Sequence, residues 1–190
     1  MRVVAEDLHC TAVRITGGDP DRIETTARYA VERGLEVWFS PFPCELSNAE
    51  MLPLFTDCAE RAERLRRDGA EVVLVTGCEL SVFARGYLPG DTLNERIPVL
   101  AGPGREAALQ GIPDKVNAFL GEAVDAVRPL FGGRVSYASC GMGCGHLREV
   151  QLLEPRIVPL RRASVITSFY RGDSGRGRLR LPATRARDRA

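Results

Sequence analysis

The sequence has no apolar run long enough to cross a bilayer and no apolar segment near its first residues. A membrane span needs roughly 18 consecutive apolar residues, and a secretory signal needs an apolar core behind a basic start. We therefore expect no membrane partner and a cytoplasmic location. In a reducing cytoplasm the six cysteines stay free, so the sequence argues against a disulfide framework.

Lysine is almost absent, because Lys115 is the only one among 26 basic residues. This bias runs along the whole chain, so abundant arginine alone does not indicate a nucleic-acid-binding protein. Charge is unevenly distributed: residues 1–140 hold 15 basic and 21 acidic residues (net −6), whereas residues 141–190 hold 11 and 4 (net +7). We expect one domain over residues 1–139 and a divergent arginine-rich tail over 140–190, with roughly its last 20 residues disordered.

Short apolar runs alternate with stretches of helical period between residues 11 and 139. This alternation is typical of βα units, whose strands form a parallel sheet. The strands are expected near residues 12–16, 35–40, 71–76 and 134–138. The fold class predicted from this pattern is α/β.

Capping residues mark where the intervening helices begin. Asp19 stands before a first-turn proline, and Ser47 with Glu50 forms a capping box for the second helix. Asp91 is expected to cap a short helix, and residues 116–127 carry the apolar stripe of a further amphipathic helix. These signals support the alternation of strands and helices.

Polar and aromatic side chains fall near the ends of the expected strands, where parallel α/β folds place reactive groups. Arg14 lies within the first strand, Trp38, Phe39 and Phe42 lie towards the end of the second, and Glu79 follows the third. An acid, a cation and an aromatic surface at one rim suit a pocket that binds and cleaves sugars. We expect these side chains to converge on one edge of the sheet.

Each of these residues also has a structural interpretation. Arg14 is a possible ion-pair partner, Trp38 a core residue, and Glu79 a residue at the start of a helix. Asp19 and Asp91 are better explained as caps or turn residues than as catalysts. The sequence leaves these alternatives open.

A cysteine-rich segment is the one candidate for a metal site. Cys140, Cys144 and His146 place two thiols and an imidazole within seven residues. Zinc sites usually combine a CxxC-type pair with a second pair of ligands, and the other cysteines and His9 do not offer that spacing. We therefore expect no metal and no other cofactor.

Long stretches of the chain look like one bacterial family. They are DLHCTAVRITGGDPDRIETTARYAVERGLEVWFSPFPCELS (7–47), TDCAERAERLRRDGAEVVLVTGCELSVFARGYLPGDT (56–92), VNAFLGEAV (116–124) and GGRVSYAS (132–139). They resemble the family labelled abortive infection proteins, whose members are similar to glycoside hydrolases with a TIM-barrel fold. The resemblance covers about residues 1–139.

The resemblance implies roles for individual residues. If residues 71–76 are the fourth barrel strand, Glu79 occupies the place of the catalytic acid/base. Arg14 then matches an arginine at the end of the second strand. Arg14, Trp38, Phe42 and Tyr137 are the side chains expected to contact the carbohydrate.

The same resemblance implies a partial (β/α)8 TIM barrel. The first barrel strand would precede Met1, and the later strands would have to fall within residues 140–190, where no Glu follows an apolar strand. The abrupt end of the resemblance suggests a change of reading frame near Cys140. With only one placed carboxylate, we expect a catalytically incomplete hydrolase that self-associates through open sheet edges.

A non-enzymatic alternative remains. The half-barrel would then be a scaffold whose basic tail binds nucleic acid or an acidic partner. Eleven arginines in residues 141–190 would give salt-sensitive affinity for polyanions. Aromatic residues for base stacking are few beyond Phe169 and Tyr170, so nucleic acid is not the expected partner.

Overall fold

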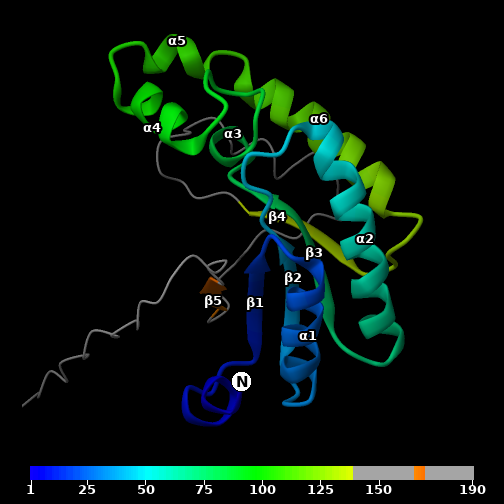
Figure 1. Ribbon diagram of the computed structural model, residues 1–190. Coiled ribbons are helices and arrows are strands. Elements are labelled where there is room, and N and C mark those ends of the chain that lie inside the picture. Colours follow the sequence, from blue (N-terminus) through cyan, green and yellow to red (C-terminus); the bar gives the residue numbers. More distant parts are fainter. Residues whose placement is uncertain (139–164, 170–190) are drawn as a thin grey trace, which may run out of the picture.

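The computed structural model describes residues 1–138 and 165–169, and these residues form an α/β fold (Figure 1). The predicted α/β class is therefore confirmed. In chain order the elements are a π-helical turn η1 (Val3–Asp7), β1 (Ala12–Gly17), α1 (Pro20–Val31), β2 (Glu36–Pro41), α2 (Asn48–Arg67), β3 (Val72–Cys78), α3 (Leu80–Phe83), α4 (Leu93–Ala101), α5 (Arg105–Leu109), α6 (Ile112–Val127), β4 (Arg134–Ala138) and β5 (Val165–Phe169).

The strands form one parallel sheet in the order β4-β3-β2-β1-β5. Each neighbouring pair is parallel, with Val13 opposite Val37 and Trp38 opposite Val73. The first four strands lie where the sequence predicts them, with ends displaced by no more than two residues. The strand β5 was not predicted, although Val165 to Thr167 is a β-branched run of the kind that favours strands.

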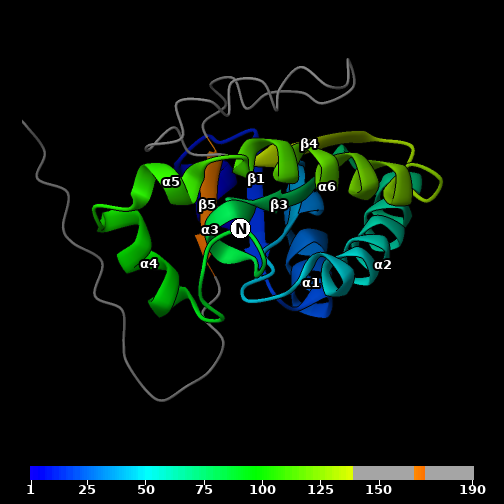
Figure 2. The same cartoon turned by 90° about the horizontal axis from the view of Figure 1, so that it is seen from above.

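Helices α1, α2 and α6 cover one face of this sheet (Figure 2). The main core lies between them and the strands, and Phe39, Phe55 and Phe119 are almost fully buried there. Phe39 was expected to give aromatic surface at the rim. That expectation is wrong, because in the register of β2 the side chain of Phe39 faces the helices. Burial of one such ring stabilises the fold by about 2–3 kcal/mol.

A second, smaller cluster lies on the opposite face of the sheet. Trp38 packs there with Ala12, Val73, Val75 and Ala138. The indole is only 5% exposed, and its Nε1–H donates to the Glu36 carboxylate at 2.6 Å. The core interpretation of Trp38 therefore describes its position better than an exposed aromatic surface.

The helix caps agree with the sequence at two of three sites. Asp19 accepts hydrogen bonds from the first turn of α1, and Ser47 and Glu50 form the predicted capping box of α2. At α4 the prediction is off by one residue, because Thr92 rather than Asp91 is the N-cap. Thr92 is paired with a glutamate three residues later, so the capping-box pattern is the stronger signal.

The winding of the sheet is simple. Strands β1 to β4 are neighbours in chain order, and helices α1, α2 and α6 from their connections share one face. The described sheet ends at β4 and β5, so closure into a barrel is not part of it. The arginine-rich tail and the cluster of Cys140, Cys144 and His146 fall outside the described residues, except for β5. In the described part of the chain no helix combines the length and the apolar character that a membrane span requires.

Candidate functional site

The turn after β3 carries the predicted acid, Glu79. Its backbone has φ 49° and ψ 45°, in the left-handed region that residues other than glycine rarely adopt. The backbone N–H of Glu79 donates to the Ala138 carbonyl at 3.0 Å, and its carbonyl accepts from Val82 and Phe83. Glu79 is the N-cap residue of α3, as its structural interpretation expects, although its side chain makes no capping hydrogen bond.

Gly77 makes the turn possible. It has φ 98°, and a Cβ atom at this position would lie 2.8 Å from Cδ2 of Leu80. Only glycine fits this combination of conformation and close approach. Two residues with positive φ, Gly77 and Glu79, therefore set the direction in which the chain leaves the sheet.

Tyr137 on β4 lies beside this turn. Its phenolic oxygen accepts a hydrogen bond from the Leu80 N–H at 3.0 Å. Burial raises the pKa of Tyr137 above its usual value, and the negative charge of Glu79 raises it further. Tyr137 is therefore a neutral hydroxyl near the Glu79 carboxylate at physiological pH.

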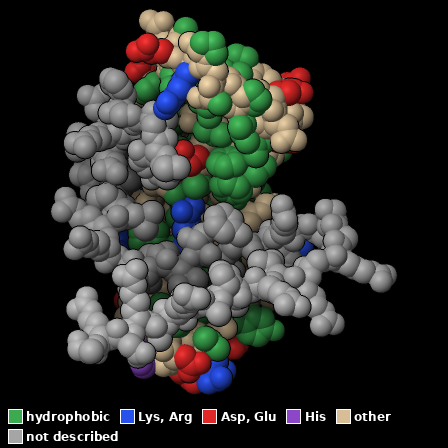
Figure 3. Space-filling model, turned by 90° about the vertical axis from the view of Figure 1, so that its left-hand side faces the viewer, with side chains coloured by type: hydrophobic (Ala, Val, Ile, Leu, Met, Phe, Trp, Pro, Cys, Tyr) green, Lys and Arg blue, Asp and Glu red, His purple; other side chains and the backbone are tan. Residues whose placement is uncertain are grey.

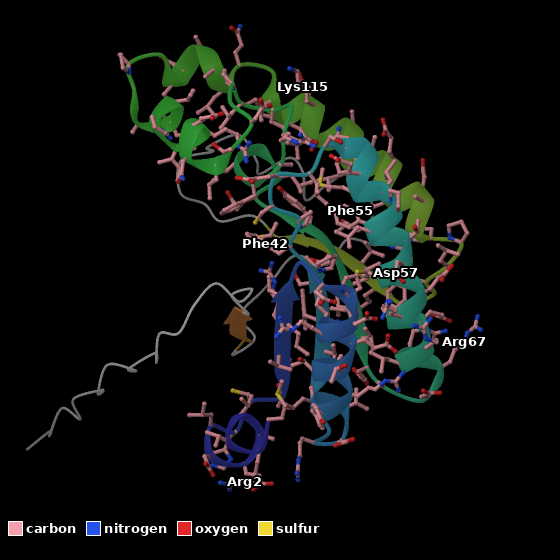
Figure 4. All side chains as sticks on the ribbon, in the orientation of Figure 1. Arg2, Phe42, Phe55, Asp57, Arg67 and Lys115 are labelled. Atoms are coloured by element: carbon pink, nitrogen blue, oxygen red, sulfur yellow. The ribbon has the colours of Figure 1, made fainter. Side chains whose placement is uncertain are left out.

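An aromatic pair connects the residue after β2 with α3. The rings of Phe42 and Phe83 are 4.7 Å apart between centroids and tilted by 58°. The N–H of Phe42 donates to the Gly17 carbonyl at 2.7 Å, which joins the ends of β1 and β2. Figure 4 shows Phe42 just beyond the tip of β1, below the helices α3 to α5. In the view of Figure 3 hydrophobic side chains gather on the same upper half of the molecule.

Arg14 lies deeper, on the face of the sheet away from the helices. It is 8% exposed, and its Nε–H donates to Ser40 Oγ at 3.0 Å. Thr16, two residues further along β1, is opposite Ser40 in the register, and its hydroxyl is buried without a partner. Within the described residues Arg14 forms no ion pair, so a structural ion pair is not supported there.

The predicted site residues thus lie at two positions along the strands. Glu79, Phe42 and Tyr137 are at the carboxyl edge of the sheet, where parallel strands place them together. Arg14 and Trp38 are opposite each other in mid-strand, one step back from that edge. Of the side chains expected at one rim, Phe42 and Glu79 are therefore at this edge, whereas Arg14 and Trp38 lie further back and Phe39 faces the helices.

Two further residues shape this edge and were not predicted. Arg96 is fully buried and donates to the carbonyls of Val82, Phe83 and Gly90. Glu45 has φ 63°, and its carboxylate accepts the N–H of Leu93. No sequence pattern marks Arg96, because a buried arginine that binds only carbonyls has no characteristic spacing.

A hollow of about 750 Å³ lies beside the carboxyl end of β1 and the first turns of α1. Its size is within the range of small-molecule pockets. The lining residues include Ile15, Thr16, Gly17, Gly18, Asp19, Asp21, Arg22, Ile23, Thr25 and Thr26.

Metal-binding chemistry finds no support in the described residues. These contain no group of three His, Cys, Asp or Glu side chains that could hold an ion. Within the described residues Cys10, Cys44, Cys58 and Cys78 form no disulfide bond. No protein-family model matches the chain, and a comparison with curated proteins also found no match.

Proposed function

We propose that this chain is a glycoside-hydrolase-like protein of partial (β/α)8 barrel type, which binds carbohydrate at the carboxyl edge of its sheet with Glu79 as the acid group. One observation carries the proposal: Glu79 follows a buried parallel strand in a strained, left-handed conformation, and its side chain does not cap α3. Strained residues tend to persist where function requires them.

The neighbours of Glu79 support a sugar pocket. A carboxylic acid at this edge can protonate a glycosidic oxygen, and the neutral hydroxyl of Tyr137 can bond to a sugar hydroxyl. The partly exposed ring of Phe42 offers the apolar surface on which the C–H face of a sugar packs. Acid, hydroxyl and ring come from the ends of three different strands, as barrel sites do.

The winding of the sheet is compatible with a barrel segment. Four successive parallel strands, with α1, α2 and α6 on one face of the sheet, repeat the βα unit from which such barrels are built. The proposed relation to the abortive infection family and the cytoplasmic location rest on the sequence alone. Self-association through the sheet edges at β4 and β5 belongs to the same proposal.

We expect binding without turnover. Retaining hydrolysis needs a second carboxylate at about 5–5.5 Å from the first. Two other acids near this edge, Asp19 and Glu45, already accept backbone N–H groups. Glu79 lies at the same edge, and its side chain makes no capping hydrogen bond to α3.

The test uses the purified 190-residue chain with a panel of neutral oligosaccharides and aryl glycosides. Calorimetry should detect binding of at least one oligosaccharide, and Phe42→Ala should weaken it by about tenfold because the stacking surface is lost. Glu106→Gln, on the exposed side of α5, serves as a control for Glu79→Gln. Failure to bind any saccharide would contradict the proposal. Turnover that disappears in Glu79→Gln would support the role of Glu79 and reveal a second carboxylate.

A further inference from the structure

The guanidinium of Arg14 has donors that the described part of the protein does not use. Only 8% of Arg14 is exposed, and its one hydrogen bond is from Nε to Ser40 Oγ. No carboxylate of residues 1–138 forms an ion pair with it. A buried cation is strongly unfavourable unless it is paired, so this arrangement calls for an anion.

Arg96 provides the comparison within the same fold. It is at least as deeply buried, but its Nε, Nη1 and Nη2 atoms each donate to a backbone carbonyl, at 2.7–3.2 Å. The role of Arg96 in holding the loops of α3 and α4 is therefore complete. Arg14 instead uses Nε for its hydrogen bond to Ser40. Its two Nη groups, which form the end of the planar fork, have no acceptor within the described residues.

The hydroxyl groups of Thr16 and Ser40 lie on the same face of the sheet as the Arg14 guanidinium. Thr16 follows Arg14 by two residues and therefore lies on the same face of β1, opposite Ser40 on β2. The Thr16 hydroxyl is fully buried and has no hydrogen-bond partner. An unpaired buried hydroxyl beside an unpaired guanidinium is a second sign of a missing ligand.

One acid on this face of the sheet, Glu36, is already engaged. Glu36 accepts the indole N–H of Trp38 through Oε1 and pairs with Arg134 through Oε2 at 2.9 Å. It therefore cannot also serve as the counter-ion of Arg14 without breaking those contacts.

We infer that Arg14, Thr16 and Ser40 form a binding site for an oxyanion, namely the carboxylate or phosphate group of a small ligand. The guanidinium fork matches the paired oxygens of either group. Thr16 is also one of the residues that line the hollow of about 750 Å³ beside α1. The identification of the ligand as an acidic or phosphorylated sugar rests on the proposed function. The anion site itself does not depend on the proposed function.

The chain carries its own reporter for this site. Trp38 is the only tryptophan and lies opposite Arg14 in the register of β1 and β2. Its fluorescence is followed while inorganic phosphate, glucuronate or glucose is added at constant ionic strength. We expect a saturable change with phosphate, glucuronate or both, and none with glucose over the same concentrations. The anion that causes the change shows whether the site binds a phosphate or a carboxylate group.

Variants separate the site from general charge effects. Arg14→Gln should weaken anion binding at least about tenfold, and Arg14→Lys should also weaken it because the fork is lost. Arg33→Gln removes a half-exposed arginine elsewhere and should leave the affinity within about twofold. If Arg14→Gln does not fold, Ser40→Ala and Thr16→Val give the same test with Arg14 in place.

Two results would overturn the inference: no saturable response to either anion, or equal affinity in the parent and the Arg14 and Ser40 variants. Binding of a neutral oligosaccharide by a chain that shows no saturable response to either anion would reject the anion site and retain the carbohydrate proposal. Anion binding in a chain that binds no neutral saccharide would support the site and reject a neutral carbohydrate as the ligand.

Discussion

The Leu80 N–H donates a hydrogen bond to the phenolic oxygen of Tyr137 at 3.0 Å, and this contact joins β4 to the turn after β3. The same turn is held a second time by the hydrogen bond from the Glu79 N–H to the Ala138 carbonyl. Residues almost 60 positions apart in the sequence therefore fix the backbone that presents the Glu79 carboxylate. Stability measurements on this turn test the geometry of the site without a known ligand.

Tyr137→Phe should lower the free energy of unfolding by about 1–2 kcal/mol, because it leaves the Leu80 N–H without an acceptor in a partly buried position. Tyr29→Phe is the matched control, since Tyr29 is 58% exposed and its change should cost less than about 0.5 kcal/mol. Urea unfolding of the three proteins measures the difference. Equal stability of the two variants would mean that the hydrogen bond has no energetic role.

Gly77→Ala should destabilise the protein by about 2–3 kcal/mol, because it combines a left-handed backbone with a Cβ atom 2.8 Å from the Leu80 side chain. Gly121→Ala in α6 makes the same chemical change in open space and should stabilise by up to about 1 kcal/mol. Thermal unfolding of both variants gives the comparison. If both alanines have the same sign of effect, the turn is less constrained than its conformation indicates.

Much of the fold was predictable because local signals and burial agree. The run from Glu71 to Thr76 is apolar on both faces, as expected for a strand covered on both sides, and β3 begins one residue later and ends two residues later than this run. Asp19 and Ser47 signalled helix starts through chemistry that depends only on their near neighbours. Strand β5 was not predicted, because a run of so few β-branched residues indicates a strand only when its pairing with β1 is known.

The site was less predictable, because side-chain direction depends on register. Arg14 and Glu79 were identified from their positions near strand ends, but the sequence does not reveal that Arg14 binds Ser40, 26 residues away. Phe39 and Trp38 are adjacent in sequence and point to opposite faces of the sheet, so one enters the main core and the other the smaller cluster. A pattern of residue types cannot make that distinction until the faces are assigned.

Stability should fall as the pH rises from about 9 to 12. Burial raises the pKa of the Cys58 thiol from 9.0 to about 12, helped by the charge of Asp57, and burial raises the pKa of Tyr87 from 10.0 to about 12. The unfolded chain then loses these protons first, so unfolding becomes easier by up to about 1.4 kcal/mol per pH unit for each group. Urea unfolding at pH 8 to 10 should give a shallower decline for Cys58→Ala, and parallel curves would contradict the assignment.

Glu63 should have the opposite pH dependence. Hydrogen bonds from Arg66, followed by those from Gly132 and Arg67, lower the pKa of Glu63 from 4.5 to about 2 against the opposing effect of burial. Because the folded pKa is the lower one, the stabilisation is present above pH 4.5 and is lost as the pH falls towards 2. Glu63→Gln should therefore cost about 2 kcal/mol at pH 7, since charge-assisted contacts to two arginines and the link from α2 to the loop before β4 are weakened.

The difference between the parent and Glu63→Gln should shrink steadily below pH 4.5 and approach zero near pH 2, where the parent carboxyl is itself becoming protonated. Glu60→Gln, on the exposed side of the same helix, controls for the loss of one negative charge and should differ little from the parent at pH 7. Denaturation curves at several pH values measure all three proteins. A difference that stays constant from pH 7 to pH 2 would show that Glu63 acts through packing and not through its charge.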